Sequence, residues 1–187
     1  MGLTSEQAHW IVGGELSLLA LALMLYETRV WRFDAVRYAP AATLLLFAAE
    51  GTLMPILHGD ARPEIIDAAT EQHFVLAGLC FVAGLVELRR AAAGLRQWVW
   101  RAPLPIAMLA TGVIFWFHAQ HAHHETNAPP LLLTVQHRIL GASLAVGAAT
   151  KTVTDLPHRV ARRFGTAWLI PVFLAGVQLL LYTEPGP

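Results

Sequence analysis

Residues 38–57 read YAPAATLLLFAAEGTLMPIL, and Glu50 is the only charged side chain among them. About 20 consecutive apolar residues are needed for an α-helix to cross the hydrocarbon core of a bilayer. The stretch therefore predicts a transmembrane helix that carries one carboxyl group in its interior.

Five further apolar segments accompany this one, each bounded by charged or turn-forming residues. They cover residues 10–26, 73–86, 103–117, 131–149 and 166–182. The segments 73–86 and 103–117 are short for a membrane span unless flanking residues such as Glu87 and His118 belong to them. Only 14% of the chain is charged and 56% is hydrophobic, whereas soluble domains carry roughly 25% charged residues. We expect residues 1–187 to form a single all-α domain, a polytopic membrane helix bundle with about six transmembrane helices.

The basic residues are divided unevenly between the connections. Six spans place both termini on one side, and the connections on the other side hold eleven of the thirteen Lys and Arg residues, which leaves Arg62 and Arg138. The positive-inside rule then predicts that the basic side is cytoplasmic and that both termini lie outside. We expect the bilayer of the plasma (cytoplasmic) membrane as the surroundings. The net charge of zero gives no support for a nucleic-acid partner.

Histidines gather on the opposite side of the predicted membrane. Of the nine histidines, only His158 falls on the basic side. Glu50 lies eight residues before His58, so the two share a helix face, and Glu15 lies inside the first segment. Ionisable groups are costly in hydrocarbon and usually face a partner or a water-filled cavity. The histidines and the two glutamates are therefore natural partners of one another.

Neutral imidazole is the commonest metal ligand, and carboxylate can complete a zinc, copper or iron site. Side chains from facing helices meet in the interior of a bundle. The sequence thus predicts a site for a transition-metal ion, copper or zinc or else iron, with these ligands: Glu50, His58, His73, His118 and His137. Further candidates are His9, Glu15, His121, His123 and His124, since the run over 118–124 could capture or pass on metal.

Other functions fit the same residues. A single haem b needs two histidines on facing helices, for example His73 and His137. A hydrogen-bonded polar network could instead hold together a scaffold or a transporter without metal. A metal-dependent membrane enzyme, such as a lipid hydrolase or oxidase, is a further alternative. No G-x-S-x-G motif is present, so no catalytic residue is assigned and enzymatic activity stays open.

Short motifs are spread over most of the chain: EQHF at 71–74 with GLVEL at 84–88, TGVIFWFH at 111–118, Glu50 spaced eight from His58, QHR at 136–138 before Leu140, and His9 before Gly13 and Gly14. Together they resemble the transmembrane protein 45-like family. Two departures stand out: family members usually have a seventh helix, and Thr111 replaces the family's Glu. The family has no settled biochemical function, so the resemblance implies a polytopic membrane fold and the same site residues, and it leaves the activity open.

Overall fold

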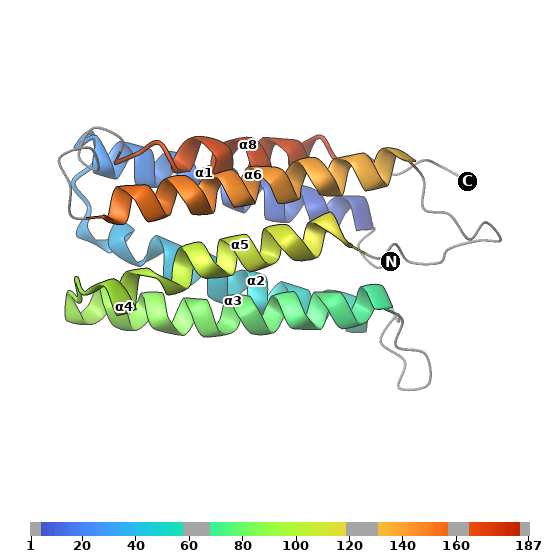
Figure 1. Cartoon of the computed structure of the whole chain (residues 1–187), viewed down its shortest axis with the longest axis horizontal. Coiled ribbons are helices and arrows are strands. Elements are labelled where there is room, and N and C mark those ends of the chain that lie inside the picture. The colour runs from blue at the N-terminus through green and yellow to red at the C-terminus, as the bar shows by residue number, and fades with distance from the viewer. Residues whose placement is uncertain (1–4, 58–67, 119–130, 157–164, 184–187) are drawn as a thin grey trace.

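The computed structural model describes residues 5–57, 68–118, 131–156 and 165–183. Within these ranges every regular element is a helix, which confirms the all-α class. The elements are α1 (Ser5–Glu27), the 3₁₀ helix η1 (Asp34–Tyr38), α2 (Ala39–Leu57), α3 (Ala68–Ala93), α4 (Trp98–Arg101), α5 (Pro103–Trp116), α6 (Leu131–Asp155) and α8 (Leu169–Leu180). The longer helices lie side by side along one axis (Figure 1).

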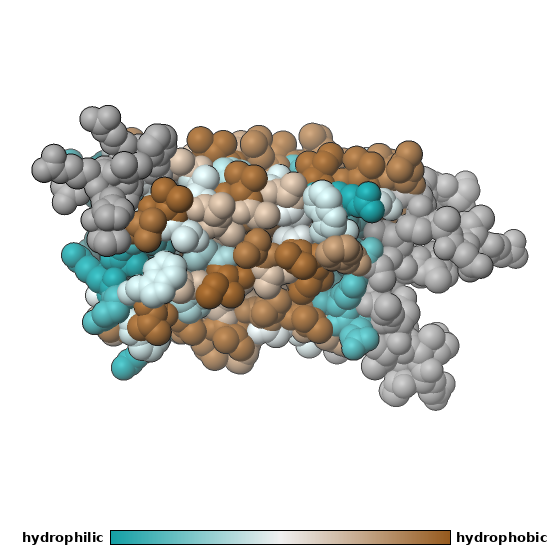
Figure 2. Space-filling model, in the orientation of Figure 1, coloured by the Kyte–Doolittle hydropathy of each residue, from teal (hydrophilic) through white to brown (hydrophobic). Residues whose placement is uncertain are grey.

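The outside of the bundle is apolar along its middle. Three described helical stretches are long and apolar enough to cross a membrane, Glu6–Glu27, Trp98–Trp116 and Leu131–Asp155, and Leu169–Leu180 is a shorter apolar helix. Large side chains such as Leu18 and Ile106 are 68% and 63% exposed. Figure 2 shows hydrophobic residues over the middle of the molecule and hydrophilic ones towards its two ends. An apolar belt of this kind suits lipid contact and indicates a membrane helix bundle.

The third helix is longer than the apolar segment 73–86 suggests. It runs for 26 residues, from Ala68 to Ala93. Glu87 is only 2% exposed, and its carboxylate pairs with Arg90 one turn later at 2.6 Å. Because the buried charge is paired within the helix, the helix can continue past it. It ends at Ala93, just before Gly94, whose φ of +63° suits glycine, so the connection between the apolar segments 73–86 and 103–117 shortens to a turn before α4.

The six longer helices form a closed ring. Each contacts its neighbours in the order α1, α2, α3, α5, α6 and α8, and α8 returns to α1. The most extensive contacts lie within the pairs α2–α3, α1–α8 and α5–α6, and the sparsest junction lies between α1 and α2. The first and last described helices therefore close the ring.

Glycines allow two of these pairs to approach backbone to backbone. A Cβ atom on Gly13 of α1 would lie 2.7 Å from the carbonyl oxygen of Gly176 in α8, and one on Gly112 of α5 would lie 2.7 Å from that of Gly141 in α6. Small residues at such crossings are a common means of helix association in membranes, where packing replaces the hydrophobic driving force.

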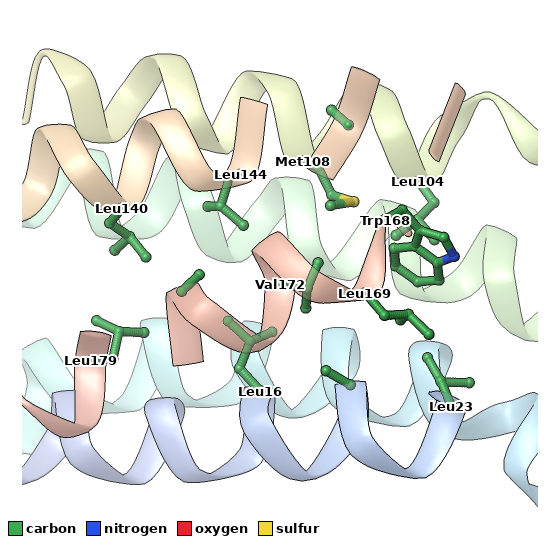
Figure 3. Packing of buried hydrophobic residues seen from close by; sticks show 13 residues of the cluster. Leu16, Leu23, Leu104, Met108, Leu140, Leu144, Trp168, Leu169, Val172 and Leu179 are labelled. Carbon is green, nitrogen blue, oxygen red and sulfur yellow. The ribbon is translucent and has the colours of Figure 1, made fainter. Parts of the chain in front are cut away.

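The fully buried core occupies only part of the ring. Its members come from α1, α5 and α6 and from α8 with the turn before it, as Figure 3 shows for Leu16, Met108, Leu144 and Val172. From α2, Leu44 and Phe47 are only partly buried against this core. The α2–α3 hairpin therefore completes the ring around a four-helix body.

The two ends of the bundle differ in chemistry. The end with η1 and α4, called the basic end, holds eight of the nine Lys and Arg residues in the described ranges: Arg29, Arg32, Arg37, Arg89, Arg90, Arg96, Arg101 and Lys151. The opposite end, called the imidazole end, holds the described histidines and includes the first residues of α1 and the last of α8.

We predict that Gly13→Ala destabilises the protein by about 1–3 kcal/mol, because α1 and α8 must separate to admit the methyl group. Thermal unfolding of the detergent-purified protein measures the effect. Gly14→Ala is the matched control, since a Cβ at Gly14 meets nothing within 4 Å. Equal unfolding midpoints for the two variants would contradict the close approach.

Candidate functional site

Four imidazole rings from four helices meet at one end of the bundle. The ring centroids of His73 and His118 lie 5.3 Å apart, those of His118 and His137 lie 4.6 Å apart, and those of His137 and His9 lie 6.2 Å apart. We call these four residues the imidazole cluster. They form a continuous series across the end of the bundle, from α3 to α1.

The alternating direction of the helices explains this meeting. His9, His73 and His137 lie in the second turns of α1, α3 and α6, and His118 follows the end of α5. Successive helices run in opposite directions, so the starts of α1, α3 and α6 lie at the same end of the bundle as the end of α5 (Figure 1). His9 and His73, which are 64 positions apart in the sequence, thereby belong to the same cluster.

The tautomer of His137 follows from its hydrogen bond. The side chain is 5% exposed, and its Nδ1 lies 2.8 Å from the carbonyl oxygen of Leu133. A carbonyl only accepts hydrogen bonds, so Nδ1 carries the proton. In the neutral ring, Nε2 is then the nitrogen with a lone pair, which is the form of histidine that binds metals.

Aromatic residues enclose the cluster on the side of α8. Tyr182 stacks on His9 with ring centroids 3.9 Å apart, and Trp10 Nε1 donates to the Tyr182 carbonyl at 2.9 Å. On the side of α5, Phe115 lies 6.0 Å from the His137 ring. Tyr182 is not among the site residues predicted from the sequence, although its position just after the last apolar helix places it at the same end as His9.

A pair of carboxyl groups lies deeper in the bundle than the imidazoles. Glu15 is six residues after His9, or about 9 Å further along α1, and its half-buried carboxyl group lies beside that of Glu50 on α2. Glu15 and Glu50 are thus a pair of polar side chains between α1 and α2, the sparsest junction of the ring.

A central cavity of about 250 Å³ borders three of these groups. His9, Glu50 and His73 lie at one end of its wall. Most of the remaining wall is apolar and comes from all six helices of the ring, for example Leu16, Met108 and Val172. The cavity lies between the four-helix body and the α2–α3 hairpin.

The structure thus brings together most of the described candidates. His73, His118, His137 and His9 form the imidazole cluster, and Glu50 shares the cavity wall with His9 and His73 while pairing with Glu15. The other candidates lie outside the described residues: His58, His121, His123 and His124. Among the residues that the structure does describe, no group of three or more His, Cys, Asp or Glu side chains has the arrangement of a metal site.

We predict that Glu50→Ala destabilises the protein by about 1–3 kcal/mol, because it leaves the buried Glu15 carboxyl without its partner. Glu50→Gln retains a hydrogen-bonding side chain and should cost less. Thermal unfolding of both variants, beside Glu27→Gln at an exposed position, measures the difference. A Glu50→Ala protein as stable as the Glu27→Gln control would argue against the carboxyl pair.

Known proteins supply no assignment for this arrangement. Comparison of the chain with family models, with curated proteins and with solved structures finds no match. The imidazole cluster, the two carboxyl groups and the central cavity are therefore the features of this chain that bear on its function.

Proposed function

We propose that this protein is a polytopic membrane protein that binds a transition-metal ion, copper or zinc, at its imidazole end. The observation that supports this proposal is the series of three imidazole contacts, which joins four different helices. A cluster of imidazoles with two carboxyl groups nearby has the donor chemistry of a zinc, copper or iron site.

The spacing of the rings fits ligands of a common ion. Two imidazoles that bind one tetrahedral ion at ~2.0–2.1 Å have ring centroids about 5 Å apart. The centroid separations of 5.3 Å for His73–His118 and 4.6 Å for His118–His137 are close to this value. The rings of His118 and His137 stack, with 24° between their planes, whereas two ligands of one metal point their ring edges at it. Binding therefore requires rotation of side chains and little movement of the helices.

The hydrogen bond of His137 supports the same proposal. Histidine ligands usually donate their second ring N–H to a carbonyl or a carboxylate, which fixes the orientation of the ring. The contact between Nδ1 and the Leu133 carbonyl has this form and makes Nε2 the nitrogen with the lone pair. His58 remains a candidate to complete the ligand set, as the resemblance to the transmembrane protein 45-like family also implies, and the run over 118–124 remains a second candidate.

The topology that we propose has six spans, with the imidazole end outside and the basic end in the cytoplasm. The charge division supports it, since eight of nine described basic residues lie at one end and basic connections stay in the cytoplasm. A location in the plasma (cytoplasmic) membrane would expose the imidazole cluster to metal ions on the outer face.

We predict that purified protein dialysed against Zn²⁺ or Cu²⁺ retains about one ion per chain, measured by elemental analysis, and that His118→Ala or His137→Ala reduces the affinity at least tenfold. Loss of one ligand removes a metal–nitrogen bond that the remaining imidazoles cannot replace. His158→Ala is the control, because the charge pattern assigns this histidine to the cytoplasmic side.

Two results would point to the alternatives. Metal content well below one per chain, unchanged by either variant, would favour a polar network that only stabilises a scaffold or a transporter. A Soret band in the absorption spectrum would favour haem b. A metal-dependent enzyme would require turnover in addition to binding, and the described residues assign no nucleophile to it.

We also predict the sidedness. In a Cys80→Ala background, which removes the single cysteine, Thr183→Cys should react with a membrane-impermeant maleimide in intact cells, whereas Asp34→Cys should react only after lysis. Both positions are exposed. The reverse labelling pattern would overturn the proposed orientation.

A further inference from the structure

A second cavity opens at the basic end of the bundle. Its volume is about 370 Å³, and its wall combines the ends of α1, α3 and α6 with the starts of α2 and α5 and the turn before α8. Five cationic side chains line it: Arg37, Arg90, Arg96, Arg101 and Lys151. We call this space the arginine vestibule.

The vestibule carries an excess of positive charge. Glu27 and Asp155 are the two carboxylates of its wall, and Asp155 already pairs with Lys151 at 2.6 Å. Arg90 pairs with the buried Glu87. Arg101 donates to the main-chain oxygen of Asp155 at 3.2 Å, a contact that neutralises no charge. Among the described residues of the wall, two cations thus pair with close carboxylates, and Glu27 is the one further carboxylate beside Arg37, Arg96 and Arg101.

The vestibule and the central cavity meet at a common wall. Pro40, Leu104 and Trp168 line both spaces. Trp168 is 9% exposed, and Lys151 Nζ lies 5.3 Å from its ring centroid. The indole therefore stands at the boundary, with the cationic vestibule on one side and the apolar cavity on the other.

We propose that these two cavities together bind an amphiphile with an anionic headgroup, a phosphate or a carboxylate, and a single apolar chain. The headgroup lies in the arginine vestibule, where guanidinium groups suit the planar, bidentate recognition of phosphate and carboxylate. The chain passes Trp168 and lies in the central cavity towards Glu50. The headgroup position is separate from the metal site, because none of the four imidazoles lines the vestibule, and His9 and His73 line the central cavity alone.

The arrangement of the helices in the ring supports entry of the ligand from the membrane. The α2–α3 hairpin joins the four-helix body through α1–α2 and α3–α5, the two sparsest junctions of the ring. Chains from the surrounding bilayer can enter a bundle most easily where neighbouring helices have few contacts. An amphiphile can thus enter sideways and keep its headgroup at the level of the membrane surface.

The experiment uses the full chain in phosphatidylcholine nanodiscs and a dodecyl phosphate that carries a diazirine near the end of its chain. After irradiation, peptide mapping should place the label on residues of the central cavity, such as Met108 or Val172. Dodecyl phosphate and dodecanoic acid should compete at concentrations at least tenfold lower than dodecanol or dodecyl trimethylammonium. A difference between the first two competitors identifies the headgroup as phosphate or carboxylate.

Matched variants test the two halves of the site. Ala107→Phe places a ring in the central cavity and should abolish labelling there, whereas Ile106→Phe, on the lipid-facing side with 63% exposure, should not change it. Arg96→Gln should weaken competition by dodecyl phosphate about tenfold, whereas Arg89→Gln, exposed and outside the vestibule, should leave it unchanged. Size-exclusion profiles establish that each variant is folded.

Three results would overturn the proposal. The label could map only to exterior residues, the neutral and cationic competitors could match the phosphate, or Arg89→Gln could weaken binding as much as Arg96→Gln does. The last result would show that the basic end attracts anionic headgroups from the membrane surface without a built site. Metal binding at the imidazole end can succeed or fail independently, because its variants and its readout are different.

Discussion

The close approach of α1 and α8 at Gly13 and Gly176 is the contact on which the rest of the structure depends. These helices lie at opposite ends of the chain, and their packing closes the ring. Closure brings His9 towards His137 and places Tyr182 over His9. A side chain at either glycine would separate the two helices and, with them, the two ends of the imidazole series.

Apolar length and the placement of charge predict much of this fold. Glu50 in its apolar segment indicated a helix with a buried carboxyl group, and the structure has α2 there. The sequence could also predict that His9, His73, His118 and His137 lie at one end, because that inference needs only the number and direction of the helices.

The contacts between helices could not be predicted in the same way. The sequence predicts that the two glutamates and the histidines are partners of one another, but not that Glu15 lies beside Glu50 in particular, or that Gly112 meets Gly141, since both contacts depend on the rotation and order of helices around the ring. The sequence underestimates the length of α3 because a charged residue such as Glu87 usually marks the end of an apolar helix, whereas its pairing with Arg90 allows it to be buried.

The arginine vestibule could not be predicted because its basic residues come from different helices. Only the fold shows which of them line one cavity.

The ring also has a consequence for the order of assembly. When a chain is made from its N-terminus, the α2–α3 hairpin has both of its helices early, but α1 lacks its main partner until α8 is complete. Until then α1 must persist in the bilayer through its own hydrophobicity, which its apolar length allows. Glu15 and Glu50 can meet during this interval, and such a contact would hold α1 beside α2 before the ring closes. The central cavity is consequently the last part of the molecule to be surrounded by all six helices.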